Sequence, residues 1–116
     1  MDTQLKRGFL DACVLATMAH DESYGYKIIK DMPASLGMSE STLYPLLKRL
    51  ESKGLIQVRK AEHNGRLRKY YSLTDQGHVF LTDFLDGKQE IENVISFVEK
   101  AVREPSRTLA TNCSER

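Results

Sequence analysis

The sequence contains no tryptophan, only two cysteines and no long apolar run. No stretch approaches the roughly 20 apolar residues that a membrane-spanning helix requires, so no membrane partner is expected. Cys13 and Cys113 lie near opposite ends of the chain and do not have the spacing of a metal site. The N-terminus has no signal-peptide pattern, because polar residues interrupt every apolar stretch. A reduced, cytoplasmic protein is therefore the expectation.

Signatures of catalysis are also missing from the sequence. It has no recognisable nucleophile–base pair, no glycine-rich phosphate loop and no carboxylate cluster with a histidine. His20, His63 and His78 are far apart and lack a second ligand at metal spacing. We therefore expect no enzymatic activity, no metal site and no other cofactor.

The charge of the chain is divided along its length. With 41% hydrophobic and 28% charged residues, the 116-residue chain has the composition of a folded domain, and its net charge is only +1. Residues 39–74 contain eight Lys or Arg and three Asp or Glu, whereas residues 75–104 contain three Lys or Arg and seven Asp or Glu. The middle of the chain would be attracted to a polyanion, and the acidic part would be repelled by it.

Apolar residues repeat with helical spacing in the first half of the chain. Residues 4–19 predict a helix that is apolar on nearly all sides and must be covered. Ser23 is expected to cap a second helix. A third helix begins at Ser39, or alternatively at Ser41, and ends at Gly54. Its apolar stripe consists of Leu43, Leu46, Leu47 and Leu50.

The period changes to that of β-strands after Gly54. The segments LIQVRKAEH and RLRKYYSL predict two strands, and Asn64-Gly65 between them is a strong hairpin signal. Thr74 then caps a long helix from about Asp75 to Arg103. Its apolar positions alternate spacings of four and three, as in a coiled coil: Phe80, Phe84, Gly87, Ile91, Val94, Val98 and Ala101. A domain this small has no interior for such a helix, so the seam predicts a homodimer with an interface of Phe80, Phe84, Ile91, Val94 and Val98.

Three helices followed by a two-stranded hairpin are typical of a winged helix-turn-helix. The predicted fold class is mainly α with a small β-hairpin, in which a winged helix-turn-helix precedes a long C-terminal dimerisation helix. We expect the DNA-binding domain in residues 1–74, the dimerisation helix in residues 75–104 and a disordered tail in residues 105–116.

The third helix and the hairpin carry residues suited to double-stranded DNA. The N-terminal residues of such a helix reach base edges, and cations further along meet phosphates. The candidates are Ser39, Ser41, Thr42, Tyr44, Lys48 and Arg49 on the helix, and Gly65, Arg66, Arg68 and Lys69 on the hairpin. Two alternatives stay open. Tyr44 could instead pack on the core, and the adjacent Lys48 and Arg49 cannot both face DNA, so one of them could pair with a carboxylate.

The chain resembles the PadR family of bacterial transcriptional regulators, and specifically its short subclass. The matching strings are LKRGFLDACVLATM, SYGYKIIKDM, MSESTLYPLLKRLESKGLI and GRLRKYYSLTDQGH, which together span residues 5–80. The resemblance implies a homodimer whose C-terminal helix packs against the partner subunit and its first helix. It also implies repression at an operator with dyad symmetry, relieved by a small aromatic or cationic ligand. By position, Ser39, Ser41, Thr42, Tyr44 and Lys48 match the recognition-helix motif of the family, and residues 65–69 match its wing.

The chain departs from the drug-sensing members of the family at one position. Those members carry a tryptophan on the C-terminal helix that sandwiches flat ligands across the dimer, whereas this sequence has Lys88 there. By position, the resemblance gives the effector candidates Leu5, Phe9, Ala12, Phe80, Phe84, Lys88 and Glu92. The alternative function is a winged-helix module that binds another protein and has no specific DNA site, because a fold does not fix a function.

Overall fold

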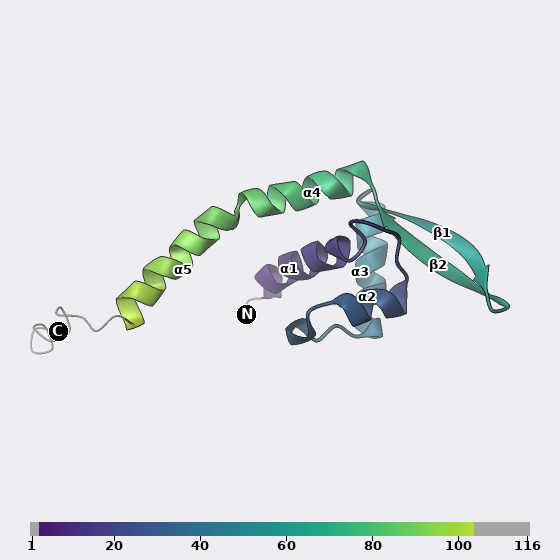
Figure 1. Cartoon of the computed structure of the whole chain (residues 1–116), viewed down its shortest axis with the longest axis horizontal. Helices are drawn as coiled ribbons and strands as arrows, with labels where there is room; N and C mark the ends of the chain where they lie inside the picture. Colours follow the sequence, from purple (N-terminus) through teal and green to yellow (C-terminus); the bar gives the residue numbers. More distant parts are fainter. Residues whose placement is uncertain (1–2, 104–116) are drawn as a thin grey trace, which may run out of the picture. The chain divides into compact units, whose positions relative to one another are not determined.

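The computed structural model describes residues 3–103, with side chains from Gly8 onward. The elements are α1 (Thr3–Ala16), α2 (Gly25–Asp31), the short 3-10 helix η1 (Ala34–Leu36), α3 (Glu40–Ser52), β1 (Ile56–His63), β2 (Arg66–Leu73), α4 (Asp75–Asp86) and α5 (Lys88–Arg103) (Figure 1). This order confirms the predicted mainly α fold with a small β-hairpin. The predicted tail, residues 105–116, lies outside the described residues.

The chain divides into two compact units, Met1–Phe84 and Leu85–Arg116. The boundary predicted after residue 74 separates a DNA-binding function from a dimerisation function. The structural division does not test it, and it stays a prediction. None of the helices within residues 3–103 has the length and apolar character to cross a membrane.

The first unit has one apolar core, in which α1, α2 and α3 meet the base of the hairpin. Its most deeply buried apolar side chains, exposed by 2% or less, are Val14, Leu15, Met18, Ile28, Leu43, Leu47 and Leu50. Burial of each such side chain contributes about 1.5–3 kcal/mol. The leucine stripe predicted for the third helix thus holds α3 in place and leaves the opposite side of α3 at the surface.

Both ends of α3 follow from its sequence. Ser39 occupies the N-cap position, although its hydroxyl contacts Ser41 Oγ at 3.1 Å and Thr42 Oγ1 at 3.2 Å rather than a backbone amide. Gly54 ends the helix with a φ of 77°, a left-handed conformation that glycine adopts without strain. The Leu55 amide then donates to the carbonyl of Leu50 at 3.0 Å.

The hairpin has the register that its turn dictates. Asn64 and Gly65 have φ values of 51° and 81°, as a two-residue type I′ turn requires. The pairs run from His63 with Arg66 at the turn to Ile56 with Leu73 at the base. We call residues 56–73 the wing.

Ser23 does not cap α2, contrary to the sequence prediction. The N-cap position belongs to Tyr24, whose side chain makes no capping hydrogen bond. Ser23 is instead 1% exposed and pairs with Tyr71 of β2 through two backbone hydrogen bonds of 2.8 and 2.9 Å. The backbone before α2 therefore extends the wing by one β-bridge, which a local capping pattern cannot reveal.

The predicted C-terminal helix is present in two segments. Thr74 caps the first one, because its Oγ1 accepts a 3.0 Å hydrogen bond from the Gly77 amide. Gly87 separates α4 from α5, and glycine in a helix interior costs about 0.5–1 kcal/mol relative to alanine. Within the second unit, α5 has no buried residue. Its exposed apolar side chains are Ile91, Val94, Ile95, Phe97, Val98 and Val102.

Candidate nucleic-acid interface

The exposed side of α3, with its N-cap residue Ser39, carries five of the ten residues predicted to bind DNA. The leucine stripe directs Ser39, Ser41, Thr42, Tyr44 and Lys48 to solvent. Tyr44 is 47% exposed, and its hydroxyl approaches Gly25 at the start of α2, so the side chain is partly packed and partly at the surface. The structure therefore brings short hydroxyls, a phenol and a cation together along one helix face.

Arg49 is turned away from this face. Its Nη2 lies 2.5 Å from Oδ1 of Asp11, a residue of α1 that is only 6% exposed. Of the adjacent cations, Lys48 is at the surface and Arg49 joins α3 to α1. The expectation that Arg49 binds DNA does not fit this geometry, because its charge is already paired with Asp11. The alternative, in which one of the two cations pairs with a carboxylate, fits it.

The wing distributes its predicted DNA-binding residues over two faces. Side chains alternate along a strand, so Lys69 shares one face with Tyr71, while Arg66 and Arg68 share the other. Lys69, Arg66 and Gly65 at the turn are exposed, whereas Arg68 is half-buried. Lys69 pairs with Lys60 across the strands, so two cations stand side by side on one face of the wing.

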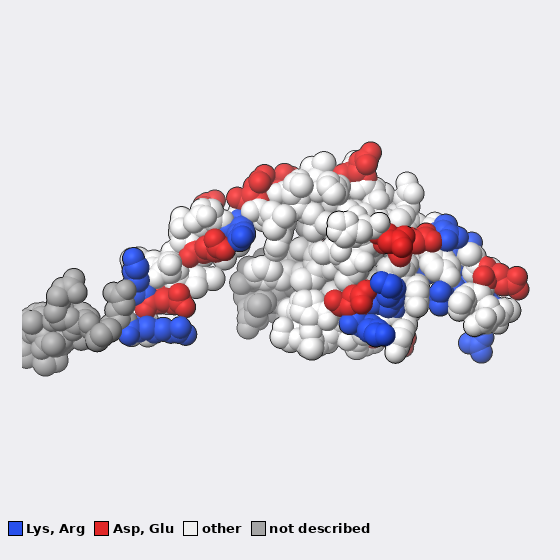
Figure 2. Space-filling model, in the orientation of Figure 1, with Lys and Arg blue, Asp and Glu red and all other residues white. Residues whose placement is uncertain are grey.

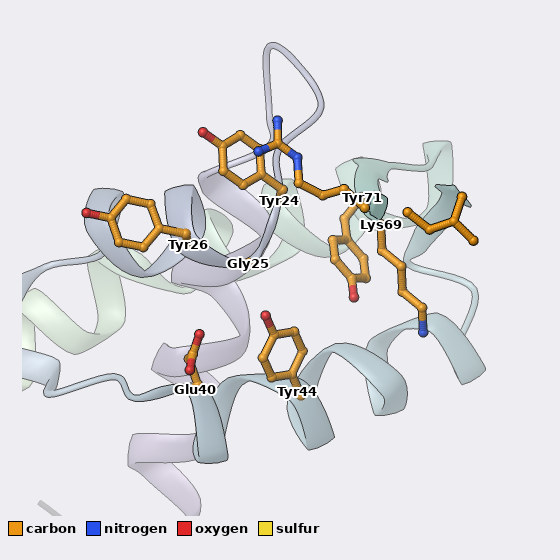
Figure 3. A pocket seen from close by; sticks show the side chains of 9 residues that line it. Tyr24, Gly25, Tyr26, Glu40, Tyr44, Lys69 and Tyr71 are labelled. Atoms are coloured by element: carbon orange, nitrogen blue, oxygen red, sulfur yellow. The ribbon is translucent and has the colours of Figure 1, made fainter. Parts of the chain in front are cut away.

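A groove of about 640 Å³ separates the start of α3 from the wing. Figure 3 shows Tyr44 of α3 and Tyr71 of β2 pointing toward each other into this groove, whereas the rings of Tyr24 and Tyr26 lie at its border and point away from it. We call it the tyrosine groove, and its lining residues are Tyr24, Gly25, Tyr26, Glu40, Tyr44, Leu67, Arg68, Lys69 and Tyr71. A second hollow, of about 210 Å³, shares Tyr44, Lys69 and Tyr71 with it and reaches Lys48. Tyr44 and Lys69 therefore face a common space between α3 and the wing.

The sequence analysis missed several of these lining residues. Tyr26 is 67% exposed in this chain, and Tyr24 is half-buried beside the wing. Strand alternation indicates the side of Tyr71, but no sequence signal shows that it meets a residue of α3. Burial raises the pKa of the Tyr71 phenol above its ordinary value, so this hydroxyl stays protonated at neutral pH.

Charges are segregated on the surface as the sequence indicated. Figure 2 shows Lys and Arg side chains over the wing with acidic groups among them, whereas the charged side chains visible along α4 are acidic. Glu22 is paired with a cation of the wing. It accepts a 2.9 Å hydrogen bond from Arg59 Nε, and this bond lowers the pKa of the Glu22 carboxyl. The pairing reduces the repulsion that Glu22 would exert on a phosphate nearby.

The predicted effector residues do not form one cluster within a single unit. In the first unit, the rings of Phe9 and Phe84 meet edge to face with centroids 5.6 Å apart, and Phe80 packs against the core. Ala12 is 5% exposed, so its own chain already covers it. In the second unit, Lys88 and Glu92 lie 3.8 Å apart and pair with each other. The side chain of Leu5 lies outside the described residues.

Metal-binding groups do not gather in the part of the chain that the structure describes. Among residues 3–103, no three His, Cys, Asp or Glu side chains lie close enough to hold an ion. Cys13 is a half-buried free thiol, and burial raises its pKa, which lowers its reactivity.

Comparison with known proteins finds similar sequences and similar folds. The family model of the transcriptional regulator PadR-like family matches residues 14–83. A PadR-like transcription factor from Bacteroides fragilis is 32% identical, with a TM-score of 0.72 over 83% of this chain and 95% of that chain. Bacillus subtilis PadR in complex with operator DNA is also 32% identical, with a TM-score of 0.61 over 66% of this chain and 46% of that chain. An uncharacterized protein from Lysinibacillus sphaericus is 31% identical over 94 residues, 77% of this chain and 86% of that protein.

Proposed function

Because the chain belongs to the PadR-like family of transcriptional regulators, we propose that it is a homodimeric repressor that binds double-stranded operator DNA with dyad symmetry. The recognition helix is α3, which enters the major groove, and the wing contacts the adjacent backbone. Such a protein acts in the cytoplasm, where its DNA target lies.

One observation carries this proposal: Tyr44 and Lys48 of α3 face the same space as Lys69 of the wing, and exposed hydroxyls precede them at the start of α3. Hydroxyl and phenol groups near the start of a recognition helix reach base edges, and lysines position the protein on phosphates. A module that binds only another protein has no need for cations on both sides of one groove. The structure of PadR with operator DNA supports this use of the fold in a relative.

The homodimer rests on the seam of the C-terminal helix. Ile91, Val94 and Val98 are 44%, 62% and 51% exposed within their own unit. An amphipathic helix with an uncovered apolar face gains stability by packing against a second apolar surface. The same face of a second copy provides one, and a two-fold axis would present two copies of α3 to the two halves of an operator.

An effector is proposed on the family resemblance alone. A small aromatic or cationic ligand that prefers a dimer geometry unmatched to the operator would weaken DNA binding by its differential affinity and no more. Phe9, Phe80 and Phe84 are the aromatic candidates in the first unit.

The decisive experiment is fluorescence anisotropy with labelled duplex from upstream of the gene that encodes this protein. The titration includes excess random competitor DNA and is repeated at several salt concentrations. Specific binding survives the competitor, and the affinity falls with salt at a log–log slope of about −0.9 per phosphate contact. Lys48→Ala is expected to weaken binding, and Lys100→Ala on α5 is the matched loss of charge at a residue outside the predicted DNA-binding set. Equal weakening by both variants, or binding abolished by competitor, would contradict the proposal and favour a protein-interaction module.

A further inference from the structure

The guanidinium of Arg68 lies between two aromatic rings. Its central carbon is 3.7 Å from the ring centroid of Tyr24 and 4.9 Å from that of Tyr70. Arg68 Nε also donates a 3.0 Å hydrogen bond to the hydroxyl of Tyr70. The two rings meet edge to face, with centroids 6.0 Å apart. The head group of Arg68 is thus held from more than one side.

This contact joins two segments that are distant in the sequence. Tyr24 precedes α2, on the helical side of the tyrosine groove (Figure 3), whereas Arg68 and Tyr70 belong to β2. The bridge between Ser23 and Tyr71 fixes the base of the wing next to Tyr24. Since a lone two-stranded hairpin is only marginally stable in water, its orientation depends on such attachments.

A second cation strengthens the attachment from β1. The guanidinium of Arg59 lies 4.7 Å from the ring centroid of Tyr70, and Arg59 also pairs with Glu22, two residues before Tyr24. Tyr70 therefore has an arginine from each strand against it. The group of Glu22, Tyr24, Arg59, Arg68 and Tyr70 is called the wing anchor.

Lys69 projects from the opposite face of β2, because it is the next residue along the strand. It lines both hollows between α3 and the wing, together with Tyr44. The strand that holds Arg68 against Tyr24 therefore also sets the place of Lys69 opposite α3.

We propose that Arg68 is a positioning residue, which holds the wing against Tyr24 so that Lys69 and Tyr44 bind the same stretch of DNA. This inference rests on the proposed function, and it reassigns Arg68 from a phosphate contact to the wing anchor. A cation stacked on an aromatic ring contributes about 0.5–2 kcal/mol. Loss of the stack is therefore expected to lower operator affinity about 2- to 30-fold.

The test compares Tyr24→Leu, Arg68→Met and the double variant in the anisotropy assay. If Arg68 acts through Tyr24, the two single variants lose similar affinity and the double variant loses little more, because each removes the same contact. Arg66→Met is the contrast, since it removes a cation from the same face of β2 at the exposed tip. The loss of operator affinity in Arg66→Met should add to the loss in Tyr24→Leu when the two changes are combined. Tyr24→Phe keeps the ring and should restore most of the affinity that Tyr24→Leu loses.

Salt dependence separates positioning from direct contact. A phosphate contact by Arg68 would make Arg68→Met lower the magnitude of the salt slope by about 0.9, with no such change in Tyr24→Leu. Matching slopes in these two variants support the wing anchor. The wing anchor is overturned if the salt slopes of Arg68→Met and Tyr24→Leu differ and their losses of operator affinity add in the double variant.

An NMR measurement tests the anchor without DNA. A ring current should shift the Arg68 Hδ resonances upfield in the unchanged protein and in Tyr24→Phe, and much less in Tyr24→Leu, where Tyr70 is the remaining ring beside Arg68. The absence of that shift in the unchanged protein overturns the anchor even if DNA binds. If the shift is present but no duplex is bound specifically, the proposed function fails, and with it the role of Arg68 in DNA binding.

Discussion

Arg49 on α3 and Asp11 on α1 form an ion pair of 2.5 Å, and the carboxylate is almost fully buried whereas the guanidinium is partly exposed. The pair joins α3 to α1. A buried charge without a partner is costly, so neither residue tolerates loss of the other.

Substitution of Asp11 by alanine is expected to destabilise the protein by about 1–3 kcal/mol. The loss is smaller than for breaking a fully buried ion pair, because the unpaired Arg49 still reaches solvent. Urea denaturation followed by circular dichroism measures the change. The control is the double variant Asp11→Leu with Arg49→Met, in which no charge is left unpaired. It should recover most of the stability; a double variant as unstable as Asp11→Ala would show that packing, not charge pairing, is responsible.

Gly25 and Tyr44 approach each other so closely that a side chain at Gly25 would displace the phenol. A Cβ at this position would overlap the Tyr44 hydroxyl, the end of a side chain that can rotate away. Gly25→Ala should therefore move Tyr44 and weaken operator binding about 5- to 30-fold, equivalent to 1–2 kcal/mol. The loss of stability should be smaller than the loss of affinity.

Gly8→Ala is the matched control for this prediction. It also replaces a helical glycine, and its Cβ would meet no atom within 4 Å. The better helix propensity of alanine should raise the free energy of unfolding by about 0.5–1 kcal/mol. Loss of operator affinity in Gly8→Ala as large as in Gly25→Ala would argue against displacement of Tyr44 as the cause.

Local patterns in the sequence were sufficient for most of the elements but not for the contacts between them. Asn64-Gly65 predicted the hairpin turn, and the leucine stripe predicted α3, because both depend on residues close in sequence. Periodicity could not decide between Lys48 and Arg49, since their difference arises from Asp11, 38 residues before Arg49. The stack of Arg68 on Tyr24 is likewise a long-range contact.

The break at Gly87 is a further limit of pattern analysis. The heptad spacing of apolar residues continues through this position, so the pattern predicts a single helix from Asp75 to Arg103. Glycine lowers helix stability there without disturbing the apolar spacing. The structure shows α4 ending at Asp86 and α5 beginning at Lys88.

Tyr71 is expected to make stability fall at alkaline pH. Burial raises its pKa in the folded protein above the ordinary value of 10.0. The stabilisation is complete below the pKa of the unfolded chain and is lost as pH rises through the folded pKa, because only the unfolded chain ionises readily. Unfolding free energies of the unchanged protein and of Tyr71→Phe, measured from pH 8 to about pH 11, should converge or cross as pH rises. A constant difference across that range would contradict a buried, neutral phenol.

A charge within the apolar face of α5 is expected to disrupt the proposed homodimer. Val94 is 62% exposed in its own unit and lies on the face that includes Ile91 and Val98. Val94→Glu would place two carboxylates at a two-fold interface, where burial of an unpaired charge costs several kcal/mol. Light scattering coupled to size-exclusion chromatography should show a dimer for the unchanged protein and a monomer for Val94→Glu. Ser96→Glu introduces the same charge about 200° further around the helix and should leave the dimer intact. If Ser96→Glu dissociates the dimer and Val94→Glu does not, a different face of α5 forms the interface.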